Sequence, residues 1–201
     1  MGYYFTRTMR VTSNIAFKEW AVVVDVLGRG EQTIILRKGG LHESQGQFQV
    51  EHNGFWLFPT QFHETEQSVV PSKRATVRDL ATGPSDPLTV TYYAVTDAVV
   101  PVTDLAVLNR LQGRHIWTQS TLQQRFAYGD QPGLHALIVR VHRLAAPITL
   151  PWLKTYGGCR SWVTLETTLT GDVTPVLSDA DFASQQDELC QLLGHHALAH
   201  S

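Results

Sequence analysis

Two segments of the chain alternate apolar and polar residues with the two-residue period of a β-strand. Residues 32–38 (QTIILRK) and 134–144 (LHALIVRVHRL) are rich in branched side chains and lie next to glycines. Two further strands are expected at 88–100 and 161–168, where Thr, Tyr or Trp residues are interleaved with Val, Ala or Leu residues. Branched and aromatic side chains favour the pleated backbone, so these four segments are predicted strands.

The segment 14–27 carries two conflicting signals. Apolar residues recur at helical spacing from Phe17 to Leu27, and they follow Ser13, a residue type that often caps helices. The valines between 22 and 26 have branched Cβ atoms, which favour a strand. We predict a helix here, with a strand as the alternative.

The pair Asn53-Gly54 separates two strand-like runs, 47–52 and 55–58. Such a pair is typical of a tight turn, so the two runs are predicted to form a hairpin that ends at Pro59. The remaining helices are expected at 72–80, 104–111, 120–127 and, behind the capping residue Ser178, 179–193.

These elements predict an α+β domain with a mixed, curled or barrel-like β-sheet and peripheral helices. The strands do not alternate regularly with long helices, which argues against a doubly wound parallel sheet. The length of 201 residues suits a single domain, placed at 13–194. Residues 1–12 are expected to be a flexible leader, and residues 195–201 a frayed tail.

Charge is distributed unevenly along the chain. All 16 Lys and Arg residues lie at or before Arg160, where 12 acids leave a balance of +4, whereas the last 41 residues carry six acids and no Lys or Arg. A mildly basic body is compatible with an anionic ligand. The acidic helix at 179–188 is a candidate docking segment for a protein partner.

The cysteines and the apolar runs indicate the compartment. Cys159 and Cys190 are the only cysteines, too few for a disulfide scaffold. No apolar run approaches the roughly 18 residues that a membrane span requires. The first 12 residues lack the apolar stretch of a secretory signal. A cytoplasmic protein without membrane contact is therefore expected.

One candidate site lies at the end of the strand 32–38. Arg37 and Lys38 precede Gly39 and Gly40. An arginine offers a planar fork to phosphate, a lysine offers a point charge, and the backbone N–H groups of a glycine pair are accessible to an anion.

Other segments carry residues that would complete such a site. Arg160 and Trp162 follow a glycine bend, and a guanidinium with an indole can hold a planar or anionic group. Arg140 lies on the strand 134–144. We predict that Arg37 and Lys38 hold phosphate, that Trp56 or Trp162 provides a stacking face, and that Arg140 and Arg160 complete a basic wall.

A second set of side chains has the chemistry of metal ligands: His42, Glu51, His52 and His63. The spacings of common zinc motifs are absent, so no metal or other cofactor is predicted. The set defines an alternative in which the protein is an enzyme that acts on a nucleotide or a phosphorylated metabolite. A protein-interaction subunit is the third hypothesis.

Several runs of sequence resemble DUF1802, a bacterial and cyanobacterial family of unknown function: AFKEWAVV (16–23), GEQTIILRKGG (30–40), FQVEH (48–52), FWLFPT (55–60) and YGGCRSW (156–162). The resemblance extends from about residue 14 to residue 169. Some members are joined to restriction-endonuclease-type domains, which implies a nucleic-acid or defence setting for those members.

A wider resemblance concerns the pattern G-x-x-T-x-x-x-R formed by Gly30, Thr33 and Arg37. It is similar to the start of the PUA-like superfamily, including its ASCH and EVE branches, which are small β-barrels that bind RNA or modified bases. Gln32 and Ile35 stand where ASCH proteins commonly have Lys and Glu. The resemblance therefore implies a contact to phosphate or base for Arg37 and no catalytic role. The preferred hypothesis is a non-catalytic module that binds RNA or DNA.

Overall fold

The structure is a computed structural model, and it describes residues 8–38, 42–44, 47–49, 52–61, 65–80, 87–158 and 160–194. For 42–44 and 47–49 it describes the backbone. The strands are β1 (Met9–Trp20), β2 (Ile34–Arg37), β3 (His42–Ser44), β4 (Gln47–Gln49), β5 (Gly54–Thr60), β6 (Leu88–Val102), β7 (Leu134–Leu150) and β8 (Trp162–Pro175). The α-helices are α1 (Ala21–Gly28), α2 (Arg74–Asp79), α3 (Leu105–Arg110), α4 (Gln119–Ala127) and α5 (Asp179–Leu193).

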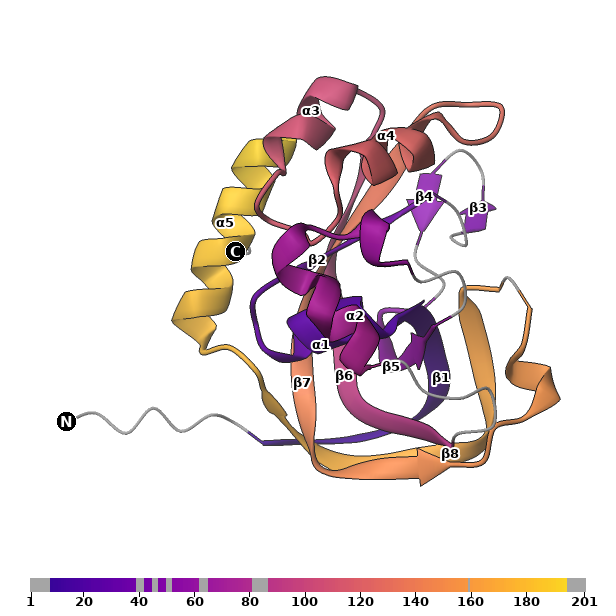
Figure 1. Ribbon diagram of the computed structural model, residues 1–201. Helices are drawn as coiled ribbons and strands as arrows, with labels where there is room; N and C mark the ends of the chain where they lie inside the picture. The colour runs from indigo at the N-terminus through magenta and orange to yellow at the C-terminus, as the bar shows by residue number, and fades with distance from the viewer. Residues whose placement is uncertain are drawn as a thin grey trace.

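Six of the strands form one mixed sheet in the order β2-β7-β6-β5-β1-β8 (Figure 1). Strand β8 also pairs with β7 at residues 142–144, so β7, β6, β5, β1 and β8 close into a barrel. Strand β2 pairs with β7 further along, at residues 135–138. Strands β1 and β5 are parallel, and the other pairs in this sheet are antiparallel. The α+β class with a mixed, barrel-like sheet is confirmed.

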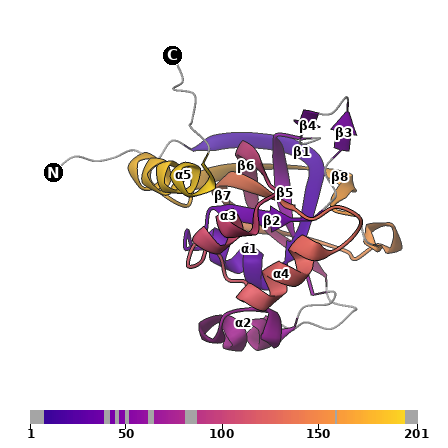
Figure 2. The same cartoon turned by 90° about the horizontal axis from the view of Figure 1, so that it is seen from above.

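The helices surround this barrel. Figure 1 shows α3 and α4 together at one end of the molecule and α5 along one side. Figure 2 shows α1 between the strands and α2, so α1 is enclosed. Its residues Ala21–Leu27 are buried except Asp25, which is half-buried. None of the helices in the described ranges is long and apolar enough to cross a membrane.

Strand β5 separates two apolar cores and is buried on both faces. Phe55 and Leu57 belong to a core that includes α1, β2 and α5 residues, whereas Trp56 and Phe58 belong to a second core that includes β8 residues. Neighbouring side chains of a strand point to opposite faces, so this four-residue apolar run supplies both cores.

The expected helix at 14–27 is wrong in its first half. Residues 14–20 belong to β1, which pairs with β5 on one side and β8 on the other. The helix begins only at Ala21, and its valines are buried in the larger core. Tertiary packing thus overrides both local preferences. Met9–Thr12, in the expected leader, are already part of β1 and pair with β8.

The predicted hairpin around Asn53-Gly54 is also wrong. Strand β4 pairs with β3, whereas β5 pairs with β1 and β6. Gly54 lies at a close approach instead of a turn, because a Cβ atom there would lie 2.0 Å from the Tyr93 hydroxyl and would force that ring to shift. Pro59 does not end β5, since it pairs with Glu19 of the parallel strand.

The other predicted elements are confirmed, and strands β2 and β6 and helices α2, α3, α4 and α5 agree with their predicted bounds within two residues. Strands β7 and β8 begin where the pattern placed them but run on to Leu150 and Pro175, beyond the predicted ends at residues 144 and 168. In α5, the Ser178 hydroxyl accepts the Asp181 N–H at 3.1 Å, and Gly194 ends the helix with φ of 68°. Local capping chemistry accounts for this helix.

Candidate functional site

Arg37 lies at the end of β2 and joins three segments of the chain. Its Nη2 donates a hydrogen bond to Ser161 Oγ at 2.8 Å, just before β8. Its Nη1 lies 3.5 Å from Oε2 of Glu19 on β1, and its guanidinium carbon lies 4.8 Å from the centre of the Phe17 ring. The side chain is 20% exposed. Arg37 is therefore held in place and still reaches solvent.

Glu19 is the acid of this site, and only 2% of its side chain is exposed. Its Oε1 accepts the Trp20 N–H at 2.9 Å. Arg125 of α4 stacks over Trp117 at 3.8 Å and over Trp20 at 5.1 Å. Burial lowers the pKa of Arg125, while the Glu19 charge raises it and the Arg37 charge lowers it. Glu19 therefore forms an ion pair with Arg37, and its charge also acts on Arg125. One carboxylate beside two guanidinium groups leaves a net positive charge.

Lys18 fixes the glycine bend that precedes β8. Its ammonium donates to the carbonyls of Gly157 and Gly158 at 3.2 and 3.1 Å, and its backbone N–H donates to the Ser161 carbonyl at 2.8 Å. Gly158 has φ of 80°, a conformation that favours glycine. Arg160 is exposed on this anchored bend. Within the described residues it forms no ion pair, so its charge is available to a ligand.

Trp162 is half-buried at the start of β8. Its ring contacts Phe17, Phe55 and His52 with centroid distances of 4.7, 5.1 and 5.3 Å. Its Nε1 is buried, and no hydrogen-bond acceptor for it occurs in the described residues. The same holds for Arg37 Nε. Two buried N–H donors that both neighbour the Phe17 ring therefore lack an acceptor, a costly arrangement unless a ligand or water completes it.

We call this group the Arg37 cluster, defined as Glu19, Arg37, Arg125, Ser161 and Trp162. Arg37 and Trp162 of this cluster are predicted from the sequence, with Arg160 expected beside them. Glu19, which lies in the segment expected to be a helix, and Arg125 on α4 are not predicted. Ser161 stands between two predicted residues, so the motif YGGCRSW contained the signal for it.

The Lys38 ammonium is fully hydrogen-bonded within the protein. Its ammonium donates to the carbonyls of Phe126 at 3.1 Å and Gly133 at 2.9 Å, and also to that of Gln131. Three acceptors satisfy all three donors of an ammonium group. Lys38 closes the loop after α4, so the expectation that it holds phosphate is not supported by its contacts.

Trp56 cannot supply a stacking face, and that expectation is corrected. Its exposed fraction is 0%, and its Nε1 donates to the Ser13 carbonyl at 2.9 Å. The indole packs in the second core beside Tyr93. An apolar run buried on both faces leaves no ring at the surface.

Arg140 lies away from Arg37, so the expected common wall is corrected as well. Arg37 pairs with His135 on β7, five residues from Arg140, and an odd spacing along a strand places side chains on opposite faces. Arg140 forms an ion pair with Asp179 of α5 and lies over the Phe182 ring at 5.3 Å. It fastens α5 to the barrel.

Four other predicted positions lie outside the described residues: Gly39, Gly40, Glu51 and His63. The backbone of His42 forms part of β3, and the ring of His52 contacts Trp162. Where the structure describes side chains, it brings no three His, Cys, Asp or Glu residues together in a group that would hold a metal ion.

Comparisons with known proteins give one family and one solved fold. No curated protein matches the chain significantly. A crystal structure of an ASCH protein from Zymomonas mobilis overlaps 87% of this chain and 94% of its own, with 12% identity and a TM-score of 0.45. A mutant of the same protein overlaps 89% and 99%, with 14% identity and a TM-score of 0.46.

The family comparison covers most of the molecule. The matching family model is described as a domain of unknown function, and the match runs from residue 16 in β1 to residue 188 in α5. It includes every member of the Arg37 cluster as well as Arg160. The chain belongs to the DUF1802 family.

Proposed function

We propose that the protein is a non-catalytic module that binds single-stranded nucleic acid, RNA above all, through the Arg37 cluster and Arg160. The observation that carries the proposal is a pair of buried donors, Arg37 Nε and Trp162 Nε1, which have no acceptor among the described residues. The exposed Arg160 lies two positions before Trp162 in the sequence. Phosphate and base edges are rich in acceptors, so they complement this arrangement.

Charge supports the same conclusion. Glu19 balances one of the two guanidinium groups near it, and Arg160 adds a further positive charge outside the buried pair. A carboxylate that orients Arg37 also limits its rotamers, so less conformational entropy is lost when the arginine meets a phosphate. The half-buried indole of Trp162 adds an aromatic surface of the kind on which bases stack.

The test is fluorescence anisotropy with a labelled single-stranded RNA of about ten nucleotides and the DNA of the same sequence. Binding is measured at about 50 and 200 mM salt, because phosphate contacts weaken as salt rises. Arg160→Gln is the informative variant, since Arg160 is exposed and its loss leaves the fold intact. We expect several-fold weaker binding and a salt dependence that is shallower by about 0.7 in the log–log slope.

Arg140→Gln is the matched control, because it removes the same charge from a different face of the sheet. It is expected to bind the RNA as the unchanged protein does. The proposal is wrong if the protein binds neither oligonucleotide at 50 mM salt. Equal losses in the two variants would also count against it, since they would indicate an effect of overall charge alone.

A further inference from the structure

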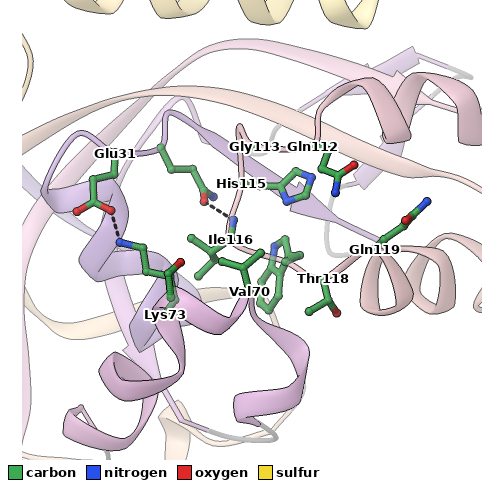
Figure 3. A pocket seen from close by; sticks show the side chains of 12 residues that line it. Glu31, Val70, Lys73, Gln112, Gly113, His115, Ile116, Thr118 and Gln119 are labelled. Atoms are coloured by element: carbon green, nitrogen blue, oxygen red, sulfur yellow. Dashed lines mark hydrogen bonds and ion pairs between the residues drawn. The ribbon is translucent and has the colours of Figure 1, made fainter.

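A concave site apart from the Arg37 cluster lies between the segment after α1, the segment before α2 and the loop that joins α3 to α4. The cavity has a volume of about 440 Å³, within the range of pockets that bind small molecules. Val70, Ile116 and Trp117 form its apolar wall, and His115, Gln112 and Gln119 contribute polar groups (Figure 3). None of the predicted binding residues that the structure describes lines it.

The walls of this cavity are fixed by interactions within the protein. Gln32 is buried; its Nε2 donates to the Ile34 carbonyl at 2.6 Å, and its Oε1 accepts the Ile116 N–H at 3.1 Å. Val69 and Trp117 form an isolated β-bridge that ties the two flanking segments together. The pocket is therefore preformed, which reduces the entropy lost when a ligand binds.

His115 is the polar group in this pocket that the protein leaves unused. Its exposed fraction is 8%, and among the described residues neither ring nitrogen has a partner at full hydrogen-bond geometry; only backbone groups of His115 and Trp117 lie close to it. Burial lowers the pKa of His115 to about 4 and outweighs the hydrogen-bonding backbone groups of His115 and Trp117, which raise it. The imidazole is therefore neutral near pH 7, with one N–H donor and one bare nitrogen that accepts.

The remaining charges of the pocket cancel. Lys73 forms an ion pair with Glu31 at the edge of the cavity (Figure 3). With a neutral imidazole and a paired lysine, the described lining of the pocket has no free charge to compensate a charged ligand that gives up its water. Its chemistry differs in this respect from that of the Arg37 cluster.

We propose that this pocket binds an uncharged small molecule that presents a planar amide, either a carboxamide or a lactam, to His115. An amide carries a donor and an acceptor on one edge, so it satisfies whichever imidazole nitrogen faces it, in either tautomer. The apolar wall accommodates the rest of a flat ligand. This inference is independent of the proposed function, since it involves other residues and a different ligand.

Three small probes of nearly the same shape test the proposal on the full chain. Nicotinamide has the amide, nicotinate replaces it by a carboxylate, and 3-acetylpyridine keeps the acceptor and lacks the donor. Binding is followed by chemical-shift changes in two-dimensional NMR spectra, with probe concentrations up to tens of millimolar. We expect saturable shifts at residues 112–119 with nicotinamide, and at least fivefold weaker binding of the other two.

Two variants distinguish the pocket from other surfaces. His115→Phe removes both nitrogens and is expected to abolish nicotinamide binding. His142→Phe is the matched control, because His142 is also buried and has an unpartnered Nδ1 but does not line the pocket. Gln112→Trp fills the entrance from an exposed position and is expected to block binding while His115 stays in place.

The thermal midpoint of His115→Phe gives a readout that does not depend on any ligand. Replacing an unpartnered buried imidazole by an apolar ring is neutral or stabilising, so the midpoint is expected to stay or rise by a few degrees. A fall would mean that the imidazole serves the fold, and it would overturn the proposal. Absence of nicotinamide shifts, equal binding of nicotinate, or unchanged binding by His115→Phe would overturn it too.

Discussion

Arg37 and Arg140 lie on neighbouring strands, and each pairs with a carboxylate and stacks on a phenylalanine ring. They differ in the acid that they meet. Glu19, the partner of Arg37, is 2% exposed, whereas Asp179, the partner of Arg140, is 91% exposed. A buried acid cannot turn to water when its arginine moves away, so it holds Arg37 in one place. Breaking the ion pair of an exposed acid changes the free energy of unfolding little, because water solvates the freed carboxylate.

This difference separates a binding position from a fastening position. Arg37 is oriented from inside the protein by the buried Glu19 and lies near the half-buried Trp162. Nε of both arginines lacks an acceptor among the described residues, so this atom does not distinguish them. Arg140 is covered by α5 and joins that helix to the barrel through Asp179 and Phe182. The sequence pattern predicted the same role, a basic wall of the binding site, for both arginines. Their roles differ because Arg37 pairs with a buried acid and Arg140 with an exposed one.

The largest expected effect comes from removing each acid in turn. Glu19→Gln leaves two guanidinium groups without their carboxylate and is expected to lower the free energy of unfolding by about 3 kcal/mol. Asp179→Asn breaks an exposed pair and is expected to cost less than about 1 kcal/mol. Urea denaturation of both variants measures the two values. Similar losses would mean that the two pairs are equivalent after all.

A double-mutant cycle examines the hydrogen bond between Arg37 and Ser161. Arg37→Met and Ser161→Ala should be coupled by about 1 kcal/mol in the free energy of unfolding, the usual value for such a bond. Arg140→Met combined with Ser161→Ala should be additive within about 0.5 kcal/mol, because these residues share no contact. Coupling in the second cycle would contradict the separation of the two arginines.

The smallest effect is a change in the titration of His142, two residues from Arg140 on β7. Burial lowers the pKa of His142, and the positive charge of Arg140 lowers it further. Arg140→Met should therefore raise this pKa, whereas Arg37→Met should leave it unchanged. An NMR titration of the imidazole signals measures both variants.

The sign of the stability effect follows from the same shift. A histidine whose folded pKa is lowered takes up its proton more readily in the unfolded chain, so stability is lost as pH falls below the ordinary value of 6.5. Arg140→Met should narrow the pH interval over which His142 causes this loss. An unchanged pKa in that variant would mean that Arg140 does not act on His142.

Elements with local signals could be predicted from the sequence, whereas elements defined by distant partners could not. Helix α5 has its own capping serine and terminal glycine, and β7 shows a long run of branched residues. Strand β1 has neither signal. Residues 14–20 are extended because β5 and β8 lie on either side of them, and β8 is about 150 residues away in the sequence.

The candidate site shows the same limit. Arg37, Arg160 and Trp162 were identifiable because cations, glycines and aromatic residues gather in two short motifs. Glu19 was not identifiable from the sequence. It meets Arg37 of β2 only because residues 14–20 form a strand, and the pattern predicted a helix there. Trp56 was misjudged because an apolar run gives no sign of whether one face or both faces are buried.

The pairing of β1 with β8 joins residues that lie far apart in the sequence, for example Met9 with Val173. During synthesis on the ribosome, β1 must wait until β8 has emerged before this neighbour exists. Contacts between such distant residues also slow folding. The nascent chain therefore passes through a stage with open strand edges, when it is most exposed to aggregation and to chaperones.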